Sequence, residues 1–355
     1  MKNSYYKFIY ACLVSGFVIT NSTSIKAGNP DRKGQAGASE LLINPWARSS
    51  GFANANSASA KGLDASFMNI AGIAHTQKTE ILFAHTNWLK GSDISINSFG
   101  FTQKVGESGV LGLGITSMDM GNIAITTVDQ PEGKLGNFSP RFLNLGVSYA
   151  KEFSHSIYGG INIKVISESI ADLKAQGVAI DAGIQYVTGK RDNVHFGISL
   201  KNVGAPLKFS GDGFAVKGTL KSTGTTLTVE QRAAKYELPA LINIGGAYDI
   251  YTSELDTVNK FTLAYTFISN SFTNNQHCVG LEYGFRKMFM IRLGYVFEKD
   301  IQKAESRITA LTGPTGGLTF EVPVGKSGST FGIDYSYRAS NPFLGSHSLG
   351  VRINL

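Results

Sequence analysis

The histidine, serine and acidic residues are the side chains of this chain that could do chemistry, and their spacing argues against a catalytic or metal site. The six histidines are scattered along the chain: His75, His85, His155, His195, His277 and His347. No two of them have the close spacing of zinc ligands. A Ser/His/acid set could form a hydrolase site, but no Gly-x-Ser-x-Gly motif frames a serine. We therefore predict that the protein is not an enzyme and holds no metal or other cofactor.

Two glycine-rich stretches and a few loop acids are weaker candidates. The stretches 211–213 and 313–317 are typical of loop turns, because a phosphate-binding loop needs a following helix and a lysine in register. Calcium could bind to acids in expected loops, which are Asp119, Asp129, Glu132 and Asp212. Their spacing differs from that of known calcium loops, so we interpret them as solvated side chains. Cys12 lies in the expected export signal, so Cys278 is the single cysteine of the expected mature chain. A single cysteine excludes an intrachain disulfide.

The alternation of apolar and polar residues is the most informative pattern. In 349–355 every second residue is apolar, and the residues between are Gly350, Arg352 and Asn354. The same period of two recurs in 178–186, 289–297 and 331–338. A soluble β-sandwich also alternates, but these strands exceed the usual length of about 5–6 residues. Several apolar faces also end in an aromatic residue, as membrane interfaces favour; examples are Trp88, Tyr149, Tyr186 and Tyr337.

The fold class predicted from this pattern is all-β, a 14-stranded antiparallel transmembrane β-barrel in the cell outer membrane. The expected strands are 79–88, 92–105, 108–119, 141–153, 156–171, 174–188, 193–203, 239–252, 259–269, 275–286, 288–299, 317–325, 329–339 and 345–355. The three longest connections, 120–140, 204–238 and 300–316, all fall on the same side. Long loops face outward and short turns face the periplasm in such barrels, so both termini are expected in the periplasm.

The N-terminus resembles an export signal. Lys2 and Lys7 precede a mostly apolar stretch, and Ala27 offers a small residue for cleavage. We therefore divide the chain into a signal peptide (1–27), an N-terminal segment (28–78) and the barrel (79–355). The net charge is +7, and without Lys2, Lys7 and Lys26 of the signal it is 7 − 3 = +4. This charge is mild and unclustered, which argues against a nucleic-acid partner.

The segment 28–78 is rich in small and polar residues and could be a disordered tail or a plug inside the barrel. The alternation places charges of both signs in the lumen: Lys164, Asp181, Asp249, Glu282, Arg292, Glu321, Asp334, Arg338 and Arg352. These charges could face water in an open channel. Mixed signs suit a plug held by ion pairs better than an ion-selective pore, so we favour the plug.

Motifs in the N-terminal segment resemble the plug of the FadL-like superfamily. The stretch 47–55, followed by 64–73, is similar to the small-residue run, acidic-small pair and Asn-Pro-Ala-Gly motif of that superfamily, with Ile70 in place of the proline. The residues that carry the motif are Arg48, Gly51, Asp64, Asn69, Ala71 and Gly72. The stretch 236–239 (Tyr-Glu-Leu-Pro), before a strand, resembles the PorV/PorQ branch known from Bacteroidota.

The resemblance implies a non-enzymatic component of type IX secretion. PorV-like members associate with a large translocon barrel and receive exported cargo by its C-terminal domain. FadL proper moves fatty acids through a lateral opening in the wall, so a channel for fatty acids or other hydrophobic compounds is the alternative. An accessory subunit of another outer-membrane assembly machine is a third possibility. The expected partners are thus outer-membrane lipid and a translocon barrel or cargo, with no requirement for a homo-oligomer.

The loop 204–238 is the predicted partner-binding surface, since exposed apolar residues often mark such sites. Its apolar candidates are Phe209, Phe214, Val216, Leu220, Leu227 and Val229. An alternative, compatible interpretation is a hairpin of 214–220 with 225–230, folded over the barrel mouth.

Overall fold

Most of the chain lies in long β-strands. The computed structural model describes residues 32, 34–252, 258–325 and 328–355, so the predicted signal peptide lies outside the described residues. Among the described residues, no helix combines the length and the apolar character needed to cross a membrane.

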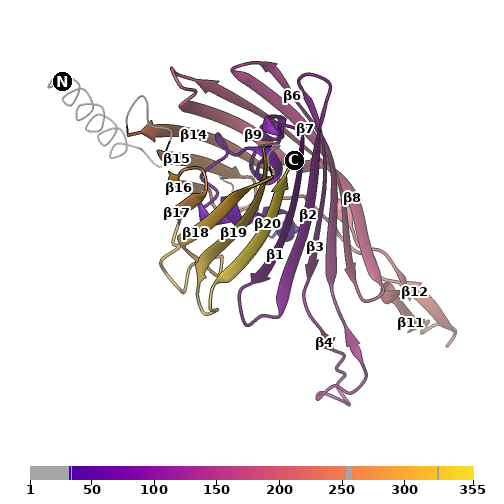
Figure 1. Ribbon diagram of the computed structural model, residues 1–355. Coiled ribbons are helices and arrows are strands. Elements are labelled where there is room, and N and C mark those ends of the chain that lie inside the picture. The colour runs from indigo at the N-terminus through magenta and orange to yellow at the C-terminus, as the bar shows by residue number, and fades with distance from the viewer. Residues whose placement is uncertain (1–31, 33, 253–257, 326–327) are drawn as a thin grey trace.

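Fourteen antiparallel strands form one closed barrel (Figure 1). In barrel order they are β1 (Thr79–Trp88), β2 (Ile94–Val105), β3 (Gly109–Asp119), β6 (Arg141–Ser154), β7 (Ile157–Ile170), β8 (Leu173–Thr188), β9 (Val194–Gly204), β14 (Leu241–Tyr251), β15 (Asn259–Asn270), β16 (Gln276–Phe285), β17 (Phe289–Glu298), β18 (Leu311–Val324), β19 (Ser329–Ser340) and β20 (Ser346–Asn354). The last strand closes the barrel on the first, with Arg352 opposite Leu82. The predicted fold class and number of strands are confirmed.

One strand boundary was predicted wrongly. β18 begins at Leu311, whereas the sequence pattern predicted a start at 317 and a turn at 313–317. Gly313 and Pro314 lie in the wall, where the register of β18 against β19 shifts between Leu311 and Thr315. A bulge tolerates a proline because the missing N–H falls where the ladder is already interrupted. The other strands begin and end within two residues of the prediction.

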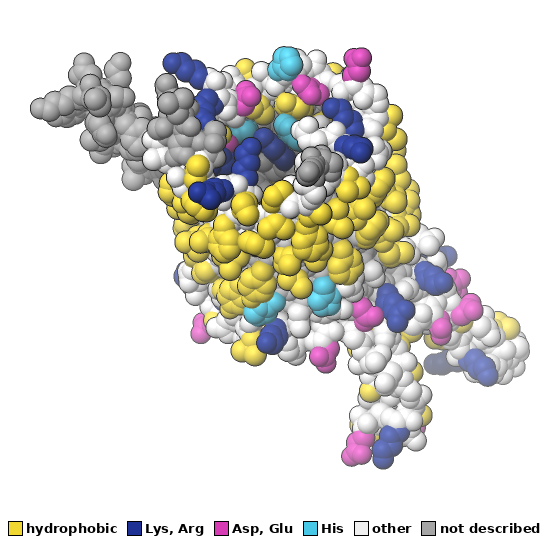
Figure 2. Space-filling view, in the orientation of Figure 1, with side chains coloured by type: hydrophobic (Ala, Val, Ile, Leu, Met, Phe, Trp, Pro, Cys, Tyr) yellow, Lys and Arg dark blue, Asp and Glu magenta, His cyan; other side chains and the backbone are white. Residues whose placement is uncertain are grey.

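The two faces of each strand differ as the alternation predicts. The outer face exposes large apolar residues, for example Ile184, Ile198 and Leu293, and Figure 2 shows them as a band around the barrel with charged side chains mainly toward its ends. Tyr149, Tyr186 and Tyr337 are also exposed on this face.

Trp88 does not belong to this outer aromatic set, so that prediction is wrong. It shares the lumen face of β1 with the buried residues Leu82 and Ala84. Its ring lies 4.7 Å from the guanidinium carbon of Arg338, a lumen residue of β19. The prediction assigned Trp88 to the interface because it ends its strand, without considering which face of the strand its position occupies.

The connections distinguish the two ends of the barrel. The short-turn end has tight connections such as 106–108 and 286–288, and the long-loop end carries 120–140, 205–240 and 299–310. Small two-stranded sheets decorate the long loops: β4 (Ile123–Ala124) with β5 (Asn137–Phe138), β10 (Leu207–Lys208) with β13 (Lys235–Tyr236), and β11 (Ala215–Thr219) with β12 (Thr226–Glu230). Figure 1 shows the β11–β12 hairpin projecting away from the barrel.

The described ends of the chain lie at opposite ends of the barrel. The Leu355 amide donates to the Thr79 carbonyl at the short-turn end, 2.9 Å away. The Gly37 amide donates to the Glu237 carbonyl at the long-loop end, 3.0 Å away. The first described residues and the C-terminus therefore lie at different ends of the barrel. Residues 1–31 lie outside the described part, so the periplasmic location of both termini stays a prediction.

Residues 39–75, which we call the plug, lie inside the barrel as a series of short helices (Figure 1). They are η2 (Ser39–Leu42), α2 (Ala47–Gly51), η3 (Gly62–Asp64), α3 (Ala65–Met68) and η4 (Ile70–His75). Helices this short are not stable alone in water, so contacts with the wall must hold them. Ala55, Ala65 and Ala71 are fully buried, which is consistent with a plug that packs tightly in the lumen.

Candidate functional site

An ion-pair cluster fastens the plug to the wall. We call it the anchor cluster, and its members are Arg48, Asp64, Glu80, Glu321, Asp334 and Arg352. Arg48 of α2 lies 3.0 Å from Glu321 and 3.2 Å from Asp334, measured from nitrogen to oxygen. Arg352 of β20 lies 2.6 Å from Glu80 and also pairs with Asp64 of the plug. The cluster thus ties the plug to four neighbouring strands, β18, β19, β20 and β1.

The charges of the anchor cluster are buried, so each depends on its partners. Arg352 is 3% exposed, Asp64 2% and Asp334 1%. A buried charge is tolerated only when it is paired, because burial removes it from water. Glu80 also accepts a hydrogen bond of 2.9 Å from the Leu63 amide of the plug. Loss of one member therefore leaves its partners charged and buried.

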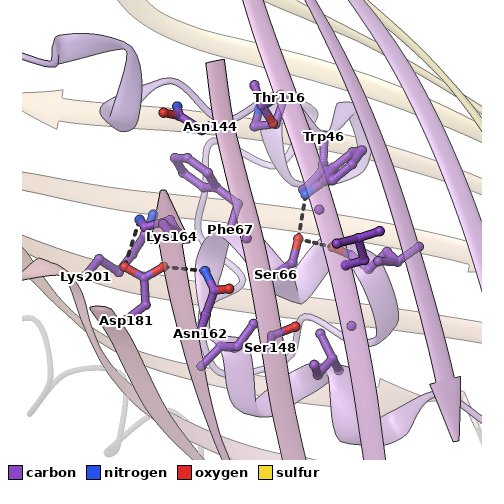
Figure 3. A pocket seen from close by; sticks show the side chains of 18 of the residues that line it. Trp46, Ser66, Phe67, Thr116, Asn144, Ser148, Asn162, Lys164, Asp181 and Lys201 are labelled. Atoms are coloured by element: carbon purple, nitrogen blue, oxygen red, sulfur yellow. Dashed lines mark hydrogen bonds and ion pairs between the residues drawn. The ribbon is translucent and has the colours of Figure 1, made fainter. Parts of the chain in front are cut away.

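A cavity of about 740 Å³, which we call the lumen cavity, lies between the plug and the wall (Figure 3). Its apolar lining comes mainly from the plug and includes Leu41, Ile43, Trp46, Phe67 and Ile70. Its wall side is made by strands β2, β3 and β6 to β9. A mostly apolar lining with a few polar groups is typical of sites for small organic molecules.

The polar end of the lumen cavity is formed by β7, β8 and β9. The Lys164 ammonium lies 2.8 Å from Asp181, whose other oxygen accepts a 3.0 Å hydrogen bond from Asn162. Lys201 is 4% exposed, and its ammonium lies 3.3 Å from the centre of the Phe67 ring. Within the described part of the chain Lys201 has no ion pair. The cavity is therefore lined by the charged Lys201 ammonium, whose nearest favourable contact is the face of the Phe67 ring.

Glu40 of the plug lies at the opening of the lumen cavity. Burial, reinforced by the negative charge of Glu168, raises the pKa of the Glu40 carboxyl to about 7. A smaller space beyond Glu40 continues between Ile96, Met118 and Phe142, toward the long-loop ends of β2, β3 and β6. The two spaces share Glu40, Ile43, Thr116 and Asn144 in their linings, so the lumen cavity extends toward the long-loop end.

Two further cavities flank the plug. One of about 590 Å³, which we call the wall cavity, is lined by Trp88 and Arg338 and by Gly313 and Pro314 of the β18 bulge. The other, of about 730 Å³, is lined by Arg48 and Asp64 and by wall residues near the short-turn end, including Lys260. No residue lines both this cavity and the lumen cavity. The plug thus separates spaces that lie toward opposite ends of the barrel.

Comparison with known proteins identifies the fold. No protein-family model and no curated protein matches the chain. The toluene transporter TodX of Pseudomonas putida superposes with a TM-score of 0.53 at 11% identity, over 88% of this chain and 97% of that one. The fold is that of a FadL-like outer-membrane barrel. The toluene transporter TbuX of Ralstonia pickettii gives 0.51 at 12% identity, over 88% and 97% of the two chains. A Pseudomonas aeruginosa FadL homologue gives 0.50 at 10%, over 86% and 96%.

The six plug-motif residues all lie in the plug of this FadL-like barrel, where they hold structure together. Arg48 and Asp64 belong to the anchor cluster. The side-chain Nδ2 of Asn69 donates a 3.0 Å hydrogen bond to the Ile184 carbonyl of the wall. Its Oδ1 accepts a 3.2 Å hydrogen bond from the backbone amide of Ala71. Gly51 and Gly72 lie where a Cβ would meet neighbouring backbone atoms at 2.8 and 2.2 Å. Ile70 stands in place of the proline of the superfamily motif, and η4 begins at this residue although the proline is missing.

The predicted lumen charges of the FadL-like barrel all face the lumen, but they divide into four groups. Asp249 and Glu282 line the cavity near the short-turn end, and Glu321 belongs to the anchor cluster. Lys164 and Asp181 line the lumen cavity. Asp334 and Arg352 belong to the anchor cluster, and Arg292 adjoins it through a 2.7 Å hydrogen bond to Thr319. Arg338 stands apart, because its Nε and Nη2 atoms have no hydrogen-bond partner among the residues that the structure describes.

The predicted partner-binding residues are only partly exposed. Val216, Leu220, Leu227 and Val229 are each more than a third exposed on the hairpin or its turn. Phe209 and Phe214 are half-buried, and Phe209 stacks on Tyr236 with 5.7 Å between ring centres, so these two are less exposed than expected and their part in partner binding stays a prediction. The alternative hairpin is present as β11 paired with β12. It projects outward and does not fold over the mouth (Figure 1).

Three residues of the site were missed by the sequence reasoning. Glu80 and Trp88 have the lumen parity of β1, and Lys201 has the lumen parity of β9. That parity could have placed them in the lumen. His195, one of the six scattered histidines, is buried in the lumen with its Nε2 3.4 Å from Asp249. No group of three or more potential metal ligands occurs among the residues that the structure describes.

Proposed function

We propose that this FadL-like barrel is a channel for small hydrophobic compounds across the outer membrane, with its long-loop end outside. The observation that carries the proposal is the lumen cavity, whose apolar lining comes mainly from the plug and which extends toward the long-loop end. A compound would enter this cavity and wait there until the plug moves. The structural neighbours TodX and TbuX are named as toluene transporters, which agrees with the proposed channel function. The likeness itself concerns the fold.

Replacement of Gly114 by leucine is expected to block this path. Gly114 lines the lumen cavity, and a Cβ added there meets no atom within 4 Å, so the new side chain starts into the cavity without a clash at its Cβ. Uptake of radiolabelled toluene and decanol by cells expressing the variant should fall about tenfold, equivalent to about 1.4 kcal/mol.

The matched control for this experiment is Gly284→Leu. Gly284 does not line any of the three cavities, and the nearest atoms to its added Cβ lie at 3.8 Å. Both variants must reach the membrane in equal amount and show the shift of a heat-modifiable barrel on gels. Undiminished uptake by Gly114→Leu would exclude the lumen cavity as the route.

The second candidate function is that of a PorV-like component of type IX secretion, with a translocon barrel or cargo domain as partner. It is supported by the β11–β12 hairpin, whose two strands are almost wholly exposed. Strands with unpaired outer edges and exposed apolar side chains are unusual unless something binds them.

Deletion of 215–230 tests this candidate without disturbing the barrel. It removes the hairpin and keeps Leu207 and Phe209, which pack on the wall beside Tyr236. If the hairpin binds a partner, affinity purification from the native membrane should lose that partner at least about tenfold, while toluene uptake continues. Equal recovery with and without the hairpin would contradict the role, and another assembly machine in the wild-type eluate would reassign it.

A further inference from the structure

Two hairpins of the barrel wall carry the same pairing of a tyrosine with a histidine on their outer face. In β15–β16 the Tyr265 hydroxyl lies 2.8 Å from Nδ1 of His277. In β19–β20 the Tyr335 hydroxyl lies 2.8 Å from Nδ1 of His347. A second aromatic ring lies opposite each imidazole, with ring centres 5.0 and 5.2 Å apart. We call these units the aromatic–histidine sites, and their members are Tyr265, Phe267 and His277 in one and Tyr335, Tyr337 and His347 in the other.

Both aromatic–histidine sites lie at the margin of the apolar band that is nearest the long loops. His277 and His347 are each the second residue of a strand that begins at the long-loop end. Figure 2 shows histidine side chains at this margin of the band. The outward positions of strands β15 to β20 hold no Asp, Glu, Lys or Arg. At this depth the imidazoles meet lipid headgroups, since aromatic belts lie at the headgroup level of a membrane.

The hydrogen bonds of His347 show which ring nitrogen donates. Its Nε2 lies 3.4 Å from the Leu344 carbonyl, and a carbonyl only accepts, so Nε2 carries the proton. The Tyr335 hydroxyl then donates to Nδ1 and fixes the orientation of the ring. The same assignment at His277 leaves an Nε2–H without a hydrogen-bond partner among the described residues. Each aromatic–histidine site thus holds an oriented N–H donor at the level of the headgroups.

Positive charges border the two sites. Arg307 donates a 2.8 Å hydrogen bond to the Asn341 carbonyl, in the connection between β19 and β20. The Lys90 amide donates to the Gly345 carbonyl of the same connection at 2.7 Å, and Lys90 is exposed. Lys299, also exposed, directly follows β17, which lies between the two hairpins. Oriented donors beside cations, on a wall face without carboxylates, are complementary to an anionic group.

We propose that the aromatic–histidine sites bind the phosphate monoester groups of a glycolipid in the outer leaflet. The proposal rests on the orientation given by the proposed channel function, in which the long loops lie outside. A phosphate monoester carries a charge of about −1.5 to −2 at neutral pH and three acceptor oxygens, so it can accept from an imidazole and pair with a neighbouring cation together. The aromatic rings beside each imidazole offer flat apolar faces to the sugar that bears the phosphate.

Binding of bisphosphorylated lipid A, and of the same lipid stripped of its phosphates, tests the proposal. Native mass spectrometry of the purified full-length barrel gives both Kd values. His277→Phe with His347→Phe keeps two aromatic rings and removes both N–H donors, so binding of the phosphorylated lipid should weaken at least about tenfold. Binding of the stripped lipid should change less than about twofold. Glutamine at both positions restores an N–H donor and should recover most of the loss. His155→Phe, at an exposed histidine of the short-turn end, is the matched control.

The outcomes separate recognition of a phosphate from an ordinary aromatic belt. Unchanged binding by the phenylalanine pair, an equal loss of both forms of lipid A, or equal binding of phosphatidylglycerol by the wild type would each overturn the proposal. Heat modification on gels shows that each variant forms the barrel. Toluene uptake through the lumen does not need these outward residues and should be unchanged in the phenylalanine pair. Loss of uptake in Gly114→Leu therefore reports on the channel function, and lipid binding reports on the wall.

Discussion

Arg352→Met is expected to release the plug and to destabilise the barrel by about 3–5 kcal/mol, the range found when one partner of a buried ion pair is removed. Arg352 compensates Asp64, Glu80 and Asp334, all of which are at most 4% exposed. Without it, no ion pair of the described residues holds Glu80, and the charges of Asp64, Glu80 and Asp334 are offset only by Arg48, which lies 3.7 Å from Asp64 and 3.2 Å from Asp334. The three carboxylates then repel one another in the lumen. Outward movement of the plug, which carries Asp64, is the direct way to relieve that repulsion.

Conductance in planar bilayers and the temperature of heat modification measure this outcome. The wild type should be closed or nearly so, whereas Arg352→Met should show long-lived openings and should unfold at a lower temperature. Asp64→Asn in the same chain removes one of the repelling charges and should restore part of the stability, because the two sites are coupled. Arg338→Met is the informative comparison, since the same substitution at an unpaired arginine should stabilise. A closed and equally stable Arg352→Met would refute the anchor role.

The alternation of the strands was enough to predict the wall, because in a barrel the parity of a residue decides whether it faces lipid or lumen. Arg352 and Asp334 were assigned to the lumen in this way, and the structure places them there. The two wrong details, Trp88 and the start of β18, are positions where local residue type was preferred to the pattern. Gly313 and Pro314 are ordinary turn residues, and only the pairing of β18 with its neighbours reveals a bulge.

The site could not be predicted to the same degree, because its contacts join distant parts of the chain. Arg352 is separated from Asp64 by 288 residues and from Glu80 by 272. The plug has no period that fixes its path, so the sequence could suggest that it is held by ion pairs but not which ones. The lumen and wall cavities depend on that path, and neither was anticipated. The paired and unpaired arginines look alike in the sequence.

The plug is also held by shape, and the wall glycines are expected to show how much. A Cβ on Gly197 would lie 2.8 Å from both the Ser57 carbonyl oxygen and the Ala58 Cα atom of the plug. A Cβ on Gly294 would lie 2.6 Å from the Ala53 Cβ and 2.9 Å from its amide nitrogen. These are mostly backbone atoms, so no change of rotamer removes the clash. We expect Gly197→Ala with Gly294→Ala to cost about 1–3 kcal/mol per site, the usual range for overpacking.

Steric displacement can be told from electrostatic release by its dependence on salt. The glycine double variant should open the barrel with a frequency that does not change with salt concentration, since the anchor cluster stays intact. Opening of Arg352→Met arises from repulsion, which screening reduces wherever the parted charges reach water. Gly246→Ala with Gly284→Ala is the control, because no atom lies within 3.7 Å of either added Cβ. If that control opens as often as the Gly197 and Gly294 pair, the close fit of plug to wall does not keep the barrel shut, and the anchor cluster acts alone.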